Sequence, residues 1–474
     1  MTTLLLLAVV GRLGIGMECL DRDLWNPEPA YSHLSELGVK RARLQSGWAR
    51  TEKVKGQYDF AWLDKIVDEL VRRGVEPWLS LSYGNPIYAA ACDGEQDYTG
   101  QKMNPLHSPE ALAAWKAYVR AIVTHYRDKV RIWEVWNEPD CKHFFKPLEG
   151  KTWVDEYLDL LKVTSETVKA VQPDAKVVAQ TAAGHDGRER CVFELFERGA
   201  GKYADIYTFH AYSARPEDFT RNYQDAFFGP IRRLAPHVEI WRGEAGISSK
   251  NSGRGALSNL PLSESLQVNW MTRHLVRDLA DPEIAYTSYF HLFDFDHYSH
   301  EVTYHYGVLR DKDYSRKPSF YALLRIKRLF DDGHAAPDRS LHLAFSPRRA
   351  MTELQTNVVN GIAVYPFRRN GLPMLAYTAS VPVTDPLKPF KARAHTTFGN
   401  STEAWKDPVL FDLVDGSVSR PPLCKDWPEW KLEVDVKDHV VVLTEAAALD
   451  GIADAGKLAP AAKSRISNSQ VDHE

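Results

Sequence analysis

The chain has few cysteines, no long apolar segment and no run of basic residues. Its five cysteines are scattered along 474 residues and show neither a CxxC pair nor metal-ligand spacing, so the sequence predicts no disulfide framework and no structural metal site. No apolar stretch is long enough to span a bilayer. The formal net charge is −4, which argues against nucleic acid or an anionic membrane as a partner.

The N-terminal residues 1–10 are apolar but lack the basic region of a signal peptide. They run directly into Gly11-Arg-Leu-Gly-Ile-Gly16, which we interpret as the start of the first strand. As it stands, the sequence therefore predicts a cytoplasmic protein. If a signal peptide was trimmed from it, the prediction becomes a secreted or periplasmic protein.

Strand-like and helix-like segments alternate up to about residue 335. The predicted strands are 13–18, 39–44, 75–81, 131–136, 176–180, 205–209, 238–241 and 284–290. The predicted helices are 31–37, 61–73, 108–126, 153–171, 191–198, 265–279 and 319–330. Eight strand–helix units in order predict a parallel (β/α)8 TIM barrel over residues 1–335.

The pattern changes after Gly333. Short alternating runs at 362–365, 375–378, 409–413, 432–434 and 440–443 are separated by Asn, Gly, Pro and Asp. They predict a smaller C-terminal antiparallel β-sandwich over residues 336–450. Residues 451–474 lack periodicity, and we expect a disordered tail.

The most informative stretch is Arg131-Ile-Trp-Glu-Val-Trp-Asn-Glu-Pro-Asp140. Its apolar and aromatic residues favour a buried strand, and Pro139 and Asp140 end that strand. Glu138 therefore lies at the carboxyl end of a barrel strand, beside the Asn137 amide. In parallel barrels that end carries the chemistry.

This motif resembles the acid/base strand of retaining glycoside hydrolases built on (β/α)8 barrels, and it is most similar to glycoside hydrolase family 39, the β-xylosidase and α-L-iduronidase family. Retaining enzymes use two carboxyl groups, an acid/base and a nucleophile. The resemblance implies Glu138 as the acid/base. It implies Glu244 as the nucleophile, because a Glu also ends strand seven in the family.

The resemblance assigns further residues to the same site. Arg43, at the end of strand two, would hold Glu244 as its anion. Asn137 would bond the sugar 2-hydroxyl, Tyr212 would orient Glu244, and His210 would support Glu138 or the sugar. Arg242 is placed with the substrate-binding side chains, and the alternative is that Glu244 is merely salt-bridged to it.

Several positions depart from the family pattern. Gln45 stands where the family has His, and Ala245-Gly246 replaces the usual residues after the nucleophile. Strand eight, Tyr289-Phe290-His291-Leu292-Phe293-Asp294, resembles the family's Tyr-Trp-Thr-Phe-Ser-Asp, with Phe290 for Trp and His291 for Thr. These changes favour a sugar other than xylose. We also expect Trp48, Tyr83, Asn85, Phe145 and Asp294 to line the cleft.

Two alternatives to a glycosidase remain open. Asp294, Asp296, His297, His300, Glu301 and His305 form a ligand-rich stretch, which would suit a metal-dependent barrel enzyme. A catalytically silent carbohydrate-binding barrel is the other. The glycosidase interpretation requires no cofactor or metal. Its partner is an oligosaccharide or glycoside substrate, and self-association into a homo-oligomer is left open.

Overall fold

The computed structural model describes residues 11–88, 104–182, 189–218, 227–251, 256–299, 302–347, 351–382, 387–398, 403–426 and 429–452. The apolar N-terminal decapeptide and, apart from Gly451 and Ile452, the predicted tail lie outside these residues. Within the described residues, no helix combines the length and the apolar character needed to cross a membrane.

Eight strands close into a barrel in the order β1 to β8, and every neighbouring pair is parallel. The prediction of a TIM barrel is confirmed. The strands are β1 Leu13–Gly16, β2 Arg41–Gln45, β3 Glu76–Leu81, β4 Ile132–Val135, β5 Lys176–Thr181, β6 Ile206–Phe209, β7 Glu239–Ala245 and β8 Tyr286–Tyr289.

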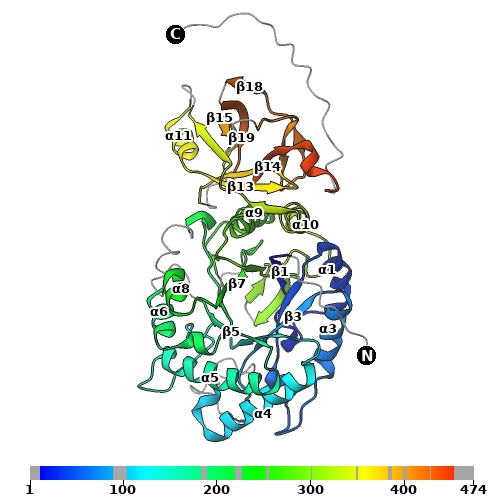
Figure 1. The fold of residues 1–474 in the computed structure, drawn as a ribbon. Coiled ribbons are helices and arrows are strands. Elements are labelled where there is room, and N and C mark those ends of the chain that lie inside the picture. Colours follow the sequence, from blue (N-terminus) through cyan, green and yellow to red (C-terminus); the bar gives the residue numbers. More distant parts are fainter. Residues whose placement is uncertain are drawn as a thin grey trace, which may run out of the picture.

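Helices surround the strands (Figure 1). They are α1 Tyr31–Leu37, α2 Trp48–Thr51, α3 Ala61–Arg72, α4 Pro109–Tyr126, α5 Trp153–Val171, α6 Glu189–Glu197, α8 Gly229–Leu234, α9 Glu264–Ala280 and α10 Pro318–Phe330. A short antiparallel pair, β9 Phe295–Ser299 and β10 Val302–Tyr304, follows β8. The sequence predicted only a polar run there.

The barrel interior is filled in layers by residues that alternate along each strand. One layer is apolar and closes the barrel; it consists of Trp78, Ile132, Val178, Ile206, Trp241 and Tyr286. The next inward positions towards the carboxyl ends are polar and buried, among them Arg43, Glu134 and Gln180. Because side chains alternate with a period of two, these polar groups share the barrel interior with the apolar layer. The buried polar side chains therefore lie at the carboxyl end of the barrel.

The C-terminal residues form two antiparallel sheets, as predicted. One has the order β11 Ala335–Pro337, β13 Ile362–Arg369, β14 Leu372–Ala379, β20 Val441–Glu445, β16 Pro408–Asp412 and β17 Val418–Ser419. The other has β12 His342–Ser346, β15 Phe390–Thr397, β19 Glu429–Val436 and β18 Leu423–Asp426, and helix α11 spans Glu353–Asn360. A shared apolar cluster that includes Tyr377 and Val434 joins the two sheets.

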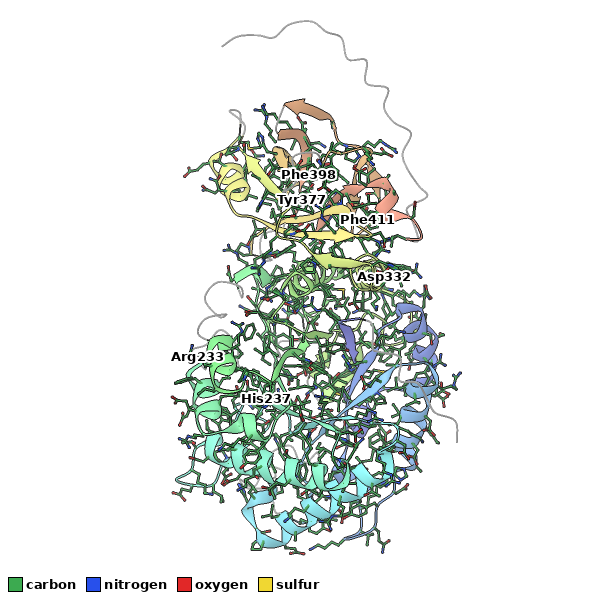
Figure 2. The ribbon with its side chains drawn as sticks, in the orientation of Figure 1. Arg233, His237, Asp332, Tyr377, Phe398 and Phe411 are labelled. Atoms are coloured by element: carbon green, nitrogen blue, oxygen red, sulfur yellow. The ribbon has the colours of Figure 1, made fainter. Side chains whose placement is uncertain are left out.

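The six-stranded sheet also packs on the barrel through α9 and α10 (Figure 1). The Phe330 and Phe367 rings meet at 4.9 Å across this junction. Arg369 of β13 pairs with Asp332 at 2.6 Å, and its guanidinium also donates to the Leu329 carbonyl. Figure 2 shows Asp332 at this boundary. The sheet is therefore buried on both faces and is anchored to the barrel on the side of α9 and α10.

Candidate active site

Glu138 lies at the barrel mouth, in an unusual backbone turn after β4. Trp136 and Glu138 both have positive φ, 67° and 48°, a left-handed conformation that residues with a Cβ seldom adopt. The backbone N–H of Glu138 donates to the side-chain oxygen of Gln180 on β5. This turn and its hydrogen bond fix the direction of the Glu138 side chain, and 14% of its surface remains exposed.

Glu244 lies within β7, where the sequence predicted it to follow the strand. The pairing of β7 with β8 shifts register between Arg242 and Ala245, and such bulges redirect side chains. Gly243 faces inward, because a Cβ there would lie 3.1 Å from Nε2 of His210. Glu244 accepts a hydrogen bond of 2.6 Å from the Tyr212 hydroxyl and one of 3.0 Å from Nη1 of Arg43.

The two carboxylates face each other across the mouth with His210 between them. Nδ1 of His210 lies 2.9 Å from Oε1 of Glu138 and 3.5 Å from Oε2 of Glu244. One ligand atom from each of these three residues lies within 4.8 Å of the other two. Burial lowers the pKa of His210 to about 4, although the Glu244 charge opposes that shift. His210 is therefore neutral at neutral pH.

Arg43 organises the floor of the site and is completely buried. All five of its N–H groups have acceptors: Glu18 at 2.9 Å, Glu244 at 3.0 Å, Asn137 at 2.8 Å and both oxygens of Glu134. Burial raises the pKa of Glu18 to about 8; Arg43 opposes this shift and Glu244 adds to it. Glu18 therefore carries its proton at neutral pH, which limits the negative charge around this guanidinium.

From the sequence, we would expect Arg43→Met to lower turnover without affecting the fold, because barrel strand ends serve function more than stability. The structure changes that expectation, since the variant leaves the buried Glu134 carboxylate unpaired. We predict a loss of about 3–5 kcal/mol in the free energy of unfolding, measured by urea denaturation at pH 7. Arg127→Met, at an exposed arginine, is the control and should change it by less than about 1 kcal/mol. Equal stability of the two variants would contradict this prediction.

Comparison with known proteins gives this site its context. The sequence model of glycosyl hydrolases family 39 matches residues 41–224, which include Arg43, Glu138 and His210. Over these residues the chain is similar to glycoside hydrolase family 39.

The curated relatives of this chain are distant. A β-xylosidase of Geobacillus stearothermophilus is 27% identical over 172 residues, which cover 34% of this chain and 32% of the relative. A β-galactosidase of Clostridium cellulovorans is 28% identical over 28% of this chain and 22% of its own length. The chain thus spans about a third or less of these curated relatives.

The fold similarity extends further than the sequence similarity. A family 39 glycoside hydrolase from Bacteroides cellulosilyticus superposes with a TM-score of 0.64 at 17% identity, over 92% of this chain and 80% of the other. A family 39 β-xylosidase from Caulobacter crescentus gives 0.56 at 17% identity, over 92% and 96%. At this identity the similarity establishes the fold alone.

Several predicted cleft residues are buried in the core instead of lining an open cleft. Trp48, Tyr83, Asn85, Phe145 and His291 are each at most 2% exposed. Nε1 of Trp48 donates to Glu52, and Asn85 donates to the Glu52 carbonyl. Tyr83 stacks on Phe144 at 6.0 Å and meets Trp136 edge-on. These side chains support the loops of the site from within the core.

Arg242 and Asp294 do not join the site as the sequence suggested. Arg242 faces outward because it follows the inward-facing Trp241 on β7, and it pairs with Asp278 of α9 at 2.7 Å. Asp294 lies 2.6 Å from the buried ammonium of Lys317 and accepts the Gly307 N–H. Both residues form buried ion pairs that stabilise the fold, so neither belongs to the substrate contacts.

The proposed metal loop gains no support from its described members. Lys317 already neutralises Asp294, and His305 approaches the same carboxylate at 3.3 Å. The side chains of Asp296 and His297 and all of His300 and Glu301 lie outside the description. Among the described residues, only Glu138, His210 and Glu244 have the spacing of a metal site, and both oxygens of Glu244 already accept hydrogen bonds.

Four residues beside the site were not predicted: Glu18, Glu134, Gln180 and Tyr306. Tyr306 packs edge-on against Tyr212 at 6.4 Å and against Phe290 at 5.4 Å, so Phe290 lies in an aromatic wall near Glu244. Glu134 and Gln180 each share the parity of an apolar inward residue on their own strands, Ile132 and Val178. A polar residue at such a position was the signal that could have revealed them.

Proposed function

We propose that this chain is a family 39 glycoside hydrolase that cleaves a glycosidic bond with net retention of anomeric configuration, with Glu138 as acid/base and Glu244 as nucleophile. The supporting observation is the short distance between them: a carboxylate oxygen of each lies within 4.8 Å of the other. Retaining enzymes hold the two carboxyls about 5–5.5 Å apart, whereas inverting enzymes need about 6.5–9.5 Å to admit a water.

In the first step, Glu138 gives its proton to the glycosidic oxygen while Glu244 attacks the anomeric carbon. The bond to the leaving group breaks and a glycosyl-enzyme forms. In the second step, Glu138 takes a proton from water, the water oxygen attacks the anomeric carbon, and Glu244 leaves as a carboxylate. Two inversions give retention.

The neighbours of the two carboxylates suit these roles. Arg43 and Tyr212 donate to Glu244, which stabilises its anion before attack and after release. The Asn137 oxygen accepts from Arg43 at 2.8 Å, which leaves its NH2 group to donate. That group is available for the sugar 2-hydroxyl, a bond that strengthens towards the transition state.

The decisive test is the configuration of the first product. We expect proton NMR, recorded before mutarotation, to show the anomer of the substrate for whichever aryl glycoside the protein cleaves. A first product of the opposite configuration would overturn the mechanism and the role of Glu244.

The sugar is identified by screening aryl β-glycosides of xylose, galactose, glucose, arabinose and fucose. Two curated relatives are a β-xylosidase and a β-galactosidase, so these two sugars come first. Turnover that is unchanged in the presence of EDTA would exclude the metal-dependent alternative. Absence of turnover on every glycoside would favour the silent carbohydrate-binding barrel.

A further inference from the structure

Gln180 links the predicted acid/base to the histidine that lies between the two carboxylates. It projects from β5 into the barrel and is completely buried. Its backbone N–H donates to the hydroxyl of Tyr157, at 2.8 Å, and that hydroxyl donates to the Val135 carbonyl on β4. The position of Gln180 is therefore held by α5 and by the strand that carries Glu138.

The orientation of the Gln180 amide follows from its partners. Its oxygen accepts the backbone N–H of Glu138, and a backbone N–H can only donate. The amide nitrogen then faces Nε2 of His210 at 3.1 Å. An amide NH2 has no lone pair to offer, so Nε2 of His210 has to be the acceptor.

The tautomer of His210 follows in turn. A neutral imidazole carries one hydrogen, and with Nε2 as acceptor that hydrogen resides on Nδ1. Nδ1 is the nitrogen that faces Oε1 of Glu138 at 2.9 Å and Oε2 of Glu244 at 3.5 Å. In the other tautomer a lone pair would point at both carboxylates, and it would repel Glu244.

We infer that Gln180 is a positioning residue: it sets the tautomer of His210, and so makes Nδ1 of His210 a hydrogen-bond donor to Glu138 beside Glu244, while the Gln180 oxygen holds the backbone of Glu138. This inference rests on the proposed function. The donated hydrogen bond strengthens as Glu138 gives up its proton to the leaving group and persists while Glu138 acts as a base. It also leaves Nδ1 without a lone pair for a metal ion.

Other charged groups around His210 act on its protonation. Glu244 and Arg242 come from β7, Arg43 from β2 and Glu134 from β4, and Glu138 follows β4. All of them are retained when Gln180 alone is replaced. Gln180→Met adds no ionisable group, so a change in its pH dependence is caused by the loss of the amide, whereas Gln180→Glu also adds a carboxyl that titrates.

The test compares two substitutions that separate tautomer control from the hydrogen bond to the Glu138 backbone. Gln180→Glu keeps the shape and the acceptor for the Glu138 N–H, but it presents an oxygen to Nε2 and demands a hydrogen there. Gln180→Met removes both hydrogen bonds. Thr181→Val is the matched control, because Thr181 is the next residue on β5 and its hydroxyl faces Tyr207 on the outer side of the barrel.

We expect Gln180→Glu to lower kcat/KM for substrates with poor leaving groups by about tenfold to a hundredfold, to affect activated aryl glycosides less, and to shift the pH–rate profile. Thr181→Val should match the wild type. If Gln180 acts only through its hydrogen bond to the Glu138 backbone, Gln180→Glu will behave like the wild type and Gln180→Met will not, and that result would overturn the inference.

A second readout does not depend on activity. Proton–nitrogen correlation spectra of protein labelled with 15N-histidine distinguish the protonated from the unprotonated ring nitrogen, and the His210→Gln variant assigns the signal. We expect the hydrogen on Nδ1 in the wild type and on Nε2 in Gln180→Glu. A wild-type signal with the hydrogen on Nε2 would refute the tautomer whether or not the protein hydrolyses a glycoside.

Discussion

Replacing Glu244 by Ala is expected to reduce turnover by at least about 10⁴-fold on both activated and unactivated glycosides. The variant lacks the carboxylate that attacks the anomeric carbon, so no glycosyl-enzyme forms even when the leaving group departs easily. Azide should enter the vacated space, attack the anomeric carbon directly and give a glycosyl azide of inverted configuration.

The measurements are kcat/KM on an aryl glycoside and the configuration of the azide product by proton NMR. Glu166→Ala, at an exposed glutamate on α5, is the control and should retain wild-type activity. Near-full activity of the Glu244→Ala variant on an activated substrate would show that another group is the nucleophile.

Replacing Glu138 by Ala should have a large effect that depends on the substrate. Glycosides with poor leaving groups should lose about 10²–10⁴-fold in rate, because their departure requires a proton. Activated aryl glycosides should form the glycosyl-enzyme nearly as fast as in the wild type and then accumulate it, since no base activates the water.

Azide distinguishes the Glu138→Ala variant from the Glu244→Ala variant. It needs no general base, so it should release the glycosyl-enzyme of Glu138→Ala and give a glycosyl azide of retained configuration. The leaving-group dependence is measured across a series of phenols of increasing acidity. An equal loss across the series, with no azide rescue, would remove Glu138 from the acid/base role.

The sequence by itself determined the architecture and predicted the main members of the proposed site. Strand–helix alternation up to about residue 335 predicted the barrel, because helical and strand periodicities differ clearly in amphipathic segments. Glu138, Glu244 and His210 end three different strands in the sequence, and the structure brings them into contact. Parallel strands in a closed barrel all end at the same rim, so position along the chain was sufficient to group them.

Only the tertiary structure decided which polar groups face the rim and which face the helices. Arg242 and Glu244 are two residues apart on β7, yet the bulge after Arg242 turns only Glu244 inward, so Arg242 pairs with Asp278 and Glu244 with Tyr212. Glu134 and Gln180 lie inside strands whose inward face cannot be assigned before the register is known, and Glu18 follows β1. Asp294 follows β8, and only the structure shows that it pairs with the buried Lys317. Local sequence specifies the period of a strand, but the direction of each side chain depends on pairing and bulges formed with distant residues.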